Sequence, residues 1–432
     1  MAMFLDAGAA DFEPKFAALL AAKREAAADV DAAAADIIAA VRARGDVALA
    51  EYSLRFDRID FASVGLRVTA QEVDAAIAAC PRAALDALNF AHERILAFHR
   101  RQVPKDELFT DALGVKLGWR WRAIEAVGLY VPGGAASYPS SVLMNAAPAK
   151  VAGCQRIAMV APAPEGKLNP LVLAAARIAG VDEIYRVGGA QAIAALAYGT
   201  ATIAPVAKIV GPGNAYVAAA KRRVFGVVGI DMIAGPSEVV VLADAGTDPR
   251  YVAADLLAQA EHDAAAQSIL ITDDSRLGRL VAEEVAKQLA QLPREKIAAA
   301  SWRDYGAIIK VAKLADAVAL VDRLAPEHLE IIAEEGEALS QAIHNAGAIF
   351  LGPYTPEAIG DYVGGSNHVL PTSRSARFSS GLGVQDFVKR TSILACDAAA
   401  LKALGPAAIT LGEAEGLAAH ARSVALRLGD LK

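Results

Sequence analysis

The chain has 432 residues, of which 55% are hydrophobic and 21% charged, and its formal net charge is −6. This length exceeds one ordinary hydrophobic core, so we expect two or more packed units. A net negative charge without a long basic block argues against nucleic acid as the main partner. The sequence contains no apolar run long enough to span a membrane, no signal peptide at its start, and no disulfide or zinc-binding spacing among its three cysteines. We therefore expect a cytoplasmic globular protein.

The first part of the chain is predicted to be helical. Residues 14–50 are rich in alanine, with apolar residues at the spacing of amphipathic helices. A second helical stretch is predicted from Thr69 to Arg101, interrupted at Cys80-Pro81. We expect residues 1–110 to form a helical region that packs on the rest of the protein.

From residue 115 onward, short apolar strands alternate with glycine-containing turns and helical stretches. This alternation is typical of parallel α/β units. The strands are expected near residues 126–131, 156–161, 183–187, 206–210, 238–243, 267–272, 306–311 and 347–351. We predict two related α/β units, over residues 111–240 and 241–380, followed by a helical arm over residues 381–432.

Two glycine-rich turns follow predicted strands, Pro132-Gly133-Gly134 and Gly211-Pro212-Gly213-Asn214. Turns of this kind let backbone amides approach a ligand closely, and the second opens a helix, whose amino end favours a phosphate. The second turn is not a G-x-G-x-x-G motif, because Tyr216 takes the place of the third glycine. A dinucleotide site and a purely structural turn both remain possible.

Gln259 and His262 lie three residues apart in a helix predicted to start at Pro249. On one helix face, an amide oxygen and an imidazole can bind a divalent metal together; a surface helix end is the alternative. Asp361 lies in a glycine-rich loop, and His420 lies near the end of the sequence. These four N and O ligands, without sulfur, would suit Zn²⁺ or Mn²⁺.

Glu327 and His328 place a carboxylate and an imidazole side by side after Pro326. An acid and a base that titrate in different ranges suit paired proton transfers, one from an alcohol and one from a water. A capped helix start is the alternative interpretation. His368 follows Asp361 in the same glycine-rich loop.

These stretches resemble the L-histidinol dehydrogenase family, and the resemblance extends over nearly the whole chain. Its motifs are Phe56-Asp-Arg, Val127-Gly-Leu-Tyr-Val-Pro-Gly-Gly, Val210-Gly-Pro-Gly-Asn-Ala-Tyr-Val, Asp231-Met-Ile-Ala-Gly-Pro-Ser-Glu-Val, the Gln259/His262 helix, Pro326-Glu-His-Leu, and Gly352-Pro-Tyr-Thr-Pro through Lys389. The resemblance implies two Rossmann-like parallel-sheet domains with an N-terminal helical region and a C-terminal helical arm. It also implies a Zn²⁺-dependent oxidation of L-histidinol, through L-histidinal, to L-histidine by two NAD⁺, the last steps of histidine biosynthesis.

The resemblance also implies roles for individual residues. His328 would take the alcohol proton, and Glu327 would activate water. Gln259, His262, Asp361 and His420 would hold one zinc per subunit, and this zinc would orient the substrate. The substrate would contact these ligands and His328, together with Ser237 and Glu415. NAD⁺ would be bound by Tyr130, Gln191 and Asn214. The family is homodimeric, and its C-terminal arm reaches the other subunit's site, so Glu415 and His420 would come from the partner subunit.

Two substrate contacts stay open at this point. Residues five apart lie about 140° apart around a continuous helix, so Glu415 and His420 would share no face within one. Glu413, seven residues before His420, is the better same-face candidate. His368 is a further candidate for a substrate contact.

Two other functions would also use some of these residues. A related NAD-dependent dehydrogenase could act on another small alcohol, but Glu415 and His420 favour histidinol. A zinc hydrolase could use Glu327 to activate water, but the glycine-rich turns favour a dinucleotide.

Overall fold

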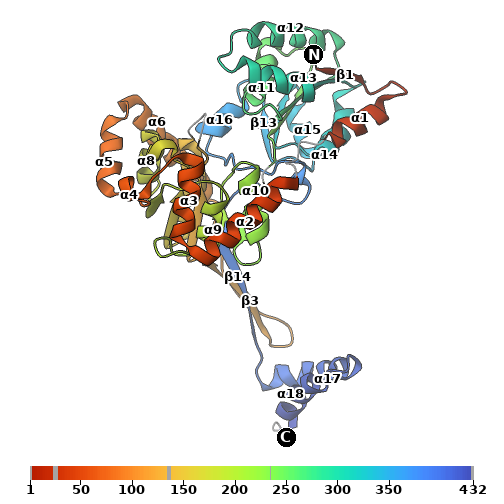
Figure 1. The fold of residues 1–432 in the computed structure, drawn as a ribbon. Helices are drawn as coiled ribbons and strands as arrows, with labels where there is room; N and C mark the ends of the chain where they lie inside the picture. The colour runs from red at the N-terminus through yellow and green to blue at the C-terminus, as the bar shows by residue number, and fades with distance from the viewer. Residues whose placement is uncertain (1, 23–27, 134–137, 234, 430–432) are drawn as a thin grey trace.

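The computed structural model describes residues 2–22, 28–133, 138–233 and 235–429. Within these residues the chain forms a five-stranded sheet, a six-stranded sheet and a three-stranded sheet. Figure 1 shows a body that contains the two larger sheets, and a long ribbon that leads from this body to a separate pair of helices. The predicted α/β fold, with two parallel-sheet units and helical terminal regions, is confirmed.

The first unit is built on the five-stranded parallel sheet, whose strand order is β6-β5-β4-β7-β8. Its strands are β4 (Ala126–Tyr130), β5 (Arg156–Val160), β6 (Glu183–Tyr185), β7 (Lys208–Val210) and β8 (Gly229–Ile230). Its helices are α7 (Pro139–Ala152), η1 (Pro164–Gly166), α8 (Pro170–Ile178), α9 (Gly189–Tyr198) and α10 (Ala215–Val224).

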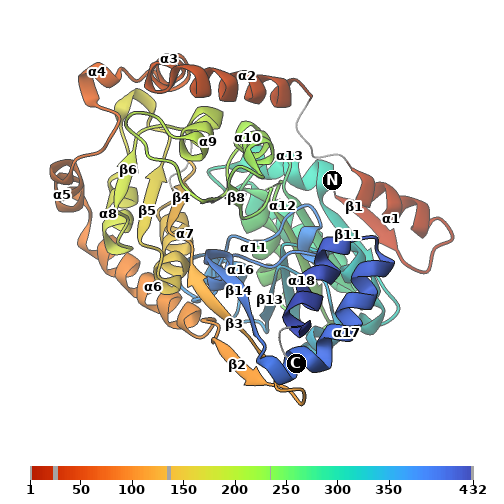
Figure 2. The same ribbon diagram turned by 90° about the horizontal axis from the view of Figure 1, so that it is seen from below.

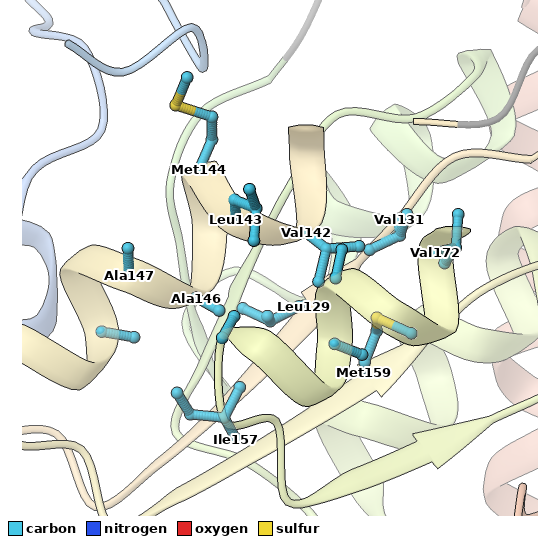
Figure 3. Packing of buried hydrophobic residues seen from close by; sticks show 14 of the residues in the cluster. Leu129, Val131, Val142, Leu143, Met144, Ala146, Ala147, Ile157, Met159 and Val172 are labelled. Atoms are coloured by element: carbon cyan, nitrogen blue, oxygen red, sulfur yellow. The ribbon is translucent and has the colours of Figure 1, made fainter. Parts of the chain in front are cut away.

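Helices from the N-terminal region complete the two faces of this sheet. They are α2 (Ala28–Arg44), α3 (Asp46–Asp57), α4 (Phe61–Val64), α5 (Ala70–Ala79) and α6 (Arg82–Arg100). Helices α5 and α6 pack with α7 and α8, whereas α2 and α3 pack with α9 and α10. Figure 3 shows Leu129, Ile157 and Met159 of the strands packed against Val142 of α7 and Val172 of α8. Both faces of the sheet are therefore buried, as its apolar strands require.

The second unit is built on the six-stranded parallel sheet, whose strand order is β1-β11-β10-β9-β12-β13. Its strands are β1 (Met3–Asp6), β9 (Glu238–Ala243), β10 (Gln267–Thr272), β11 (Ala307–Lys310), β12 (His328–Ile332) and β13 (Ala348–Leu351). Its helical segments are α1 (Phe12–Ala21), α11 (Pro249–Ala260), α12 (Ser275–Leu289), α13 (Glu295–Tyr305), η2 (Leu314–Asp316), α14 (Ala317–Leu324), α15 (Gly336–Ala342), α16 (Glu357–Tyr362) and η3 (Ser375–Arg377). Strand β1 lies in the region expected to be helical, yet it pairs with β11 and extends this sheet.

The third sheet is antiparallel and carries the C-terminal arm. Its strands are β2 (Glu107–Thr110), β3 (Lys116–Ala123) and β14 (Val388–Ala395), and η4 (Val384–Phe387) precedes β14. The arm itself consists of α17 (Ala398–Ala414) and α18 (Ala418–Gly429), which pack on each other. Figure 2 shows these two helices in front of the body when the molecule is seen from below. No helix in the described ranges has the length and apolar character that a membrane crossing needs.

Candidate active site

The amino ends of β9 and β12 lie side by side and carry the Glu327–His328 pair. His328 is the first residue of β12, so the pair begins a strand and not a capped helix. Oε2 of Glu327 accepts a hydrogen bond from the Glu238 N–H at 3.1 Å, and His328 Nδ1 lies 3.2 Å from the Glu238 carbonyl oxygen. A carbonyl only accepts hydrogen bonds, so Nδ1 carries the proton of the neutral ring. In the neutral ring, the other nitrogen, Nε2, carries the lone pair that can take a proton.

Three carboxylates surround the His328 ring. Glu357 Oε2 lies 3.7 Å and Glu327 Oε2 3.9 Å from Nδ1, and Asp361 Oδ1 lies 3.7 Å from Nε2. Burial lowers the pKa of His328, but these carboxylate charges outweigh burial and hold it well above its ordinary value. Burial raises the pKa of Glu327 to about 7 and that of Glu357 to about 8. The site therefore holds carboxyl groups that change charge near neutral pH, as acid–base catalysis requires.

Two of the buried carboxyl groups near His328 were not singled out from the sequence. Glu330 Oε1 accepts a hydrogen bond from the Glu357 N–H at 2.6 Å. Burial raises the pKa of Glu330 to about 10, and the nearby Asp255 carboxyl adds to the shift. Both residues have a weak signal in the sequence: Glu330 follows His328 by two along a strand, and Glu357 precedes Asp361 by four on a helix. Each spacing places the pair on one face of its element.

Three of the four predicted metal ligands lie near this edge of the second unit. Gln259 is in the last turn of α11, whereas His262 lies in the turn after the helix, where its N–H bonds the Gln259 carbonyl at 3.2 Å. Gln259 and His262 were expected on one face of a single helix, but the helix ends between them and His262 lies in the following turn. His262 is exposed, yet the protein around its ring lowers its pKa, which the charge of Asp361 raises and that of His328 lowers further. The His262, Asp361 and His328 side chains therefore lie close together.

The chemistry of this group fits a metal. Gln259 is 1% exposed, and among the described residues neither its Oε1 nor its Nε2 has a hydrogen-bond partner. A buried amide without partners is unfavourable unless a further group binds it. An amide oxygen, an imidazole and a carboxylate are N and O ligands that zinc accepts. In the described parts of one chain, no three His, Cys, Asp or Glu side chains are placed to hold a metal by themselves.

Glu415 and His420 lie on the arm and not beside Gln259 of the same chain. Helix α17 ends at Ala414, Glu415 caps it, and His420 lies in the first turn of α18. Glu415 therefore precedes the first turn of the helix that carries His420, and the continuous helix that favoured Glu413 does not form. Both side chains are exposed. Figure 1 shows the arm at the far end of the ribbon from α11 and α16, so one chain by itself does not bring His420 to Gln259.

Ser237 and His368 border the site from two loops. Ser237 is half-buried directly before β9. His368 donates from Nδ1 to the Asp361 carbonyl oxygen at 3.0 Å, and its Nε2 lies 3.3 Å from Ser141 Oγ. Both ring nitrogens of His368 are thus engaged, and one of them bonds the backbone of a predicted metal ligand.

The predicted cofactor residues meet at the carboxyl edge of the five-stranded sheet. Tyr130 ends β4, and its hydroxyl accepts a hydrogen bond from the Gly189 N–H at 3.1 Å. Gly211 has a φ of +111°, and a Cβ atom there would stand 2.1 Å from the Tyr130 carbonyl oxygen. Asn214 caps α10, and Gln191, in the first turn of α9, is buried with no partner for Oε1 among the described residues. Gly134, part of the other predicted glycine-rich turn, lies outside the described residues.

The arrangement at this edge fits a pyrophosphate. The amino ends of α9 and α10 lie at this edge, and the helix dipoles favour negative charge there. A buried ion pair fixes the loop: Gly211 donates to Asp231 Oδ2 at 2.8 Å, and Lys221 bonds both Asp231 and the Gly211 carbonyl. The Gly211 loop is thus held at the place where open α/β sheets bind dinucleotides.

A doubly wound unit with such turns, joined to a second unit with a buried acid–imidazole pair, defines a two-unit α/β oxidoreductase. Comparisons with known proteins identify its family. The model of the histidinol dehydrogenase family matches residues 20–428. The histidinol dehydrogenase of Bradyrhizobium diazoefficiens is 67% identical over 428 residues, and that of Rhodopseudomonas palustris is 68% identical over the same length; each alignment covers 99% of both chains. The crystal structure of histidinol dehydrogenase from Elizabethkingia anophelis matches with a TM-score of 0.95 at 36% identity, covering 100% of this chain and 98% of that one. The chain belongs to the histidinol dehydrogenase family, as the resemblance in its sequence predicted.

Proposed function

We propose that this protein oxidises L-histidinol through L-histidinal to L-histidine with two NAD⁺, in the last steps of histidine biosynthesis in the cytoplasm. The observation that carries the proposal is the buried Glu327–His328 pair at the same sheet edge as the buried Gln259 amide, which has no hydrogen-bond partner among the described residues. Proton transfer and metal binding would then meet in one place. Membership of the family supports this substrate over another small alcohol.

His328 and Glu327 would move the protons of the reaction. In the first oxidation, His328 Nε2 takes the hydroxyl proton of the alcohol. At the same time, the alcohol carbon that bears this hydroxyl gives a hydride to NAD⁺. Glu327 then takes a proton from the water that adds to the aldehyde. In the second oxidation, His328 takes a hydroxyl proton of this hydrate as a second hydride leaves. Alcohol, water and two NAD⁺ thus give a carboxylate, two NADH and three protons, all of which leave to solvent.

The residues that would hold zinc are Gln259, His262 and Asp361, with His420 of the partner subunit as the fourth ligand. When bound, zinc would supply a fixed positive charge that orients the imidazole and amino groups of the substrate. Ser237 would also contact the substrate. Further contacts are proposed for His368 and for Glu415 of the partner subunit.

The two units would have different functions. The first, residues 111–240, would bind NAD⁺ through Tyr130, Gln191 and Asn214. The second, residues 241–380, would carry most of the metal and catalytic residues. The arm, residues 381–432, would complete the site of the other subunit in a homodimer. Its two helices, α17 and α18, lie apart from the body of their own chain, which supports this proposal.

The test is NADH formation from L-histidinol and NAD⁺, with protein whose zinc content is known, before and after a chelator. We expect two NADH per histidinol, loss of activity with the metal, and recovery with Zn²⁺. No NADH from a zinc-loaded protein would contradict the substrate. The same assay with other small alcohols would then test the related-dehydrogenase alternative.

A further inference from the structure

The loop over residues 363–369 follows Asp361 in the second unit but is fastened to the first. Arg94, on α6, donates from Nε to the Val363 carbonyl oxygen at 2.6 Å and from Nη2 to the Gly364 carbonyl oxygen at 2.9 Å. Helices α6 and α7 pack on the five-stranded sheet. The position of this loop is therefore set by the junction of the two units.

Asn367 makes the innermost of these attachments. Its Nδ2 donates to the Met144 carbonyl oxygen at 2.7 Å and lies 3.4 Å from His99 Nε2. Its Oδ1 accepts a hydrogen bond from the Val369 N–H at 2.9 Å. The side chain is buried, as are Met144 and His99. Both amide hydrogens and the amide oxygen are thus used, and they join α6, α7 and the loop.

The sequence of the first unit provides both acceptors. Pro148 lies inside α7 and has no N–H, so the Met144 carbonyl lacks the usual helical donor four residues later. On α6, His99 donates from Nδ1 to the Ile95 carbonyl oxygen at 2.8 Å, which leaves Nε2 as an acceptor in the neutral ring. Burial lowers the pKa of His99, outweighing the Ile95 and Leu382 backbone carbonyls that raise it, and so favours that neutral form. Asn367 supplies the donor that each acceptor needs.

We propose that Asn367 is a positioning residue, which anchors the loop between Asp361 and Val369 to His99 and Met144 and so fixes Asp361 and His368 beside His328. His368 transmits the restraint, because its ring bonds the Asp361 backbone. The inference rests on the proposed function, since Asp361 acts there as a zinc ligand. Groups that orient metal ligands typically change metal affinity or activity about 10- to 100-fold when they are altered.

Two variants weaken the anchor in different ways. Asn367→Asp keeps the shape of the side chain and the oxygen that accepts the hydrogen bond from the Val369 N–H. Its second oxygen replaces the Nδ2 donor and would lie against two acceptors, the Met144 carbonyl and His99 Nε2. Pro148→Ala restores a helical N–H that competes for the Met144 carbonyl, while it raises the intrinsic helix propensity of α7. The matched control is Asn145→Ala, because Asn145 is also buried on α7 but, among the described residues, its side chain bonds only the Ser141 carbonyl of its own helix, at 2.7 Å.

The experiment uses the zinc-loaded full-length enzyme and has two readouts. Hydrogen–deuterium exchange of the peptide that covers residues 361–369 reports the anchor directly and needs no substrate. Steady-state kinetics then report its effect, with thermal unfolding measured alongside. We expect faster exchange in both variants. We also expect kcat/KM for histidinol to fall about 10- to 100-fold in Asn367→Asp and about 2- to 10-fold in Pro148→Ala, with KM for NAD⁺ unchanged.

The control should lose stability without faster exchange in this peptide and without the loss of kcat/KM. Unchanged exchange in Asn367→Asp and Pro148→Ala would overturn the inference, and so would equal effects in Asn145→Ala. If the unaltered enzyme forms no NADH from histidinol, the proposed function fails, but the exchange readout still decides whether Asn367 anchors the loop.

Discussion

The two parallel-sheet units have the same strand order but present their candidate sites at opposite edges. Numbered within each unit, β4 to β8 and β9 to β13 both lie in the order 3-2-1-4-5, and the second sheet is extended by β1. In the first unit, the glycine-rich loops lie at the carboxyl edge, where open α/β sheets usually bind ligands. In the second unit, Glu327 and His328 lie at the amino edge. Strand order therefore predicts how the layers pack but not which edge carries the chemistry.

The junction between the units explains the difference. The Asp361–His368 segment lies beside His328 at the amino edge of the second sheet, and the same segment bonds helices of the first unit. A site at this edge can therefore receive groups from both units, whereas the opposite edge of the second sheet faces away from these contacts. The predictions that follow test the assignment of each edge.

The largest effect is expected from His328→Ala, which removes the base at the amino edge of the second unit. We expect kcat to fall about 10²- to 10⁴-fold, the usual contribution of general acid–base catalysis. Zinc content, measured by metal analysis, should stay the same because His328 is not a proposed ligand. The control is His344→Ala, an exposed histidine paired with Asp322, which should keep full activity. Full activity in His328→Ala would remove the base assignment.

A second prediction concerns α17 and α18 of the arm, which lie apart from both sheet units of the same chain. Gln259→Ala and His420→Ala should each lose zinc and nearly all activity. If the arm completes the partner's site, subunits of the two variants that are mixed at equal amounts should regain about a quarter of the activity, because half of the dimers contain one intact site. The measurement is NADH formation after denaturation and joint refolding. No recovery, with mixed dimers present, would contradict arm exchange.

A smaller effect is expected at the carboxyl edge of the first unit. Gly211→Ala adds a Cβ atom that would meet the Tyr130 carbonyl oxygen, so the loop must shift. We expect KM for NAD⁺ to rise about tenfold, equivalent to about 1.4 kcal/mol, with little change in KM for histidinol. Gly226→Ala is a matched control, because Gly226 also has a positive φ but no atom within 4 Å of the added Cβ. Equal effects of the two changes would indicate backbone strain and no cofactor role.

The smallest effect on catalysis is expected from Glu330→Gln. This variant tests the buried carboxyl groups near His328 through the pH dependence of the stability of the protein. Burial raises the folded-state pKa of Glu330 to about 10, above its unfolded value, so the fold favours the neutral carboxyl. Below the unfolded pKa this stability is fully present, and it is lost as pH rises toward the folded pKa. Glutamine cannot ionise, so thermal unfolding should show a variant that gains stability relative to the parent between pH 5 and pH 9. If the difference in stability between the variant and the parent did not change with pH, the raised pKa of Glu330 would be contradicted.

Much of the fold could be predicted from local patterns. The break at Cys80-Pro81 separates α5 from α6, and the apolar runs of the α/β region became strands. Strand β1 was missed because its four residues have no pattern of their own and pair with a strand some three hundred residues away. The start of the arm was expected to be helical, but β14 pairs along its whole length with β3, and such pairing depends on a distant partner.

The candidate site divides in the same way. Glu327 and His328 are adjacent in the sequence, and Gln259 and His262 are three apart, so proximity along the chain was enough to pair them. Asp361 could be joined to them only through the family resemblance. Glu330 and Glu357 were missed because a carboxyl group looks like a surface residue until its burial is known.

By itself, the sequence determined which segments become strands and helices, where glycines allow tight turns, and which family the chain resembles. These features depend on local backbone preferences and on the period of apolar residues, and both are set by residues close together in the sequence. Only the tertiary structure decided which edge of each sheet carries the side chains, how deeply Glu357 and Glu330 are buried, and that Asn367 completes the acceptor left open by Pro148. Those outcomes depend on contacts between segments hundreds of residues apart, and no local pattern specifies such contacts.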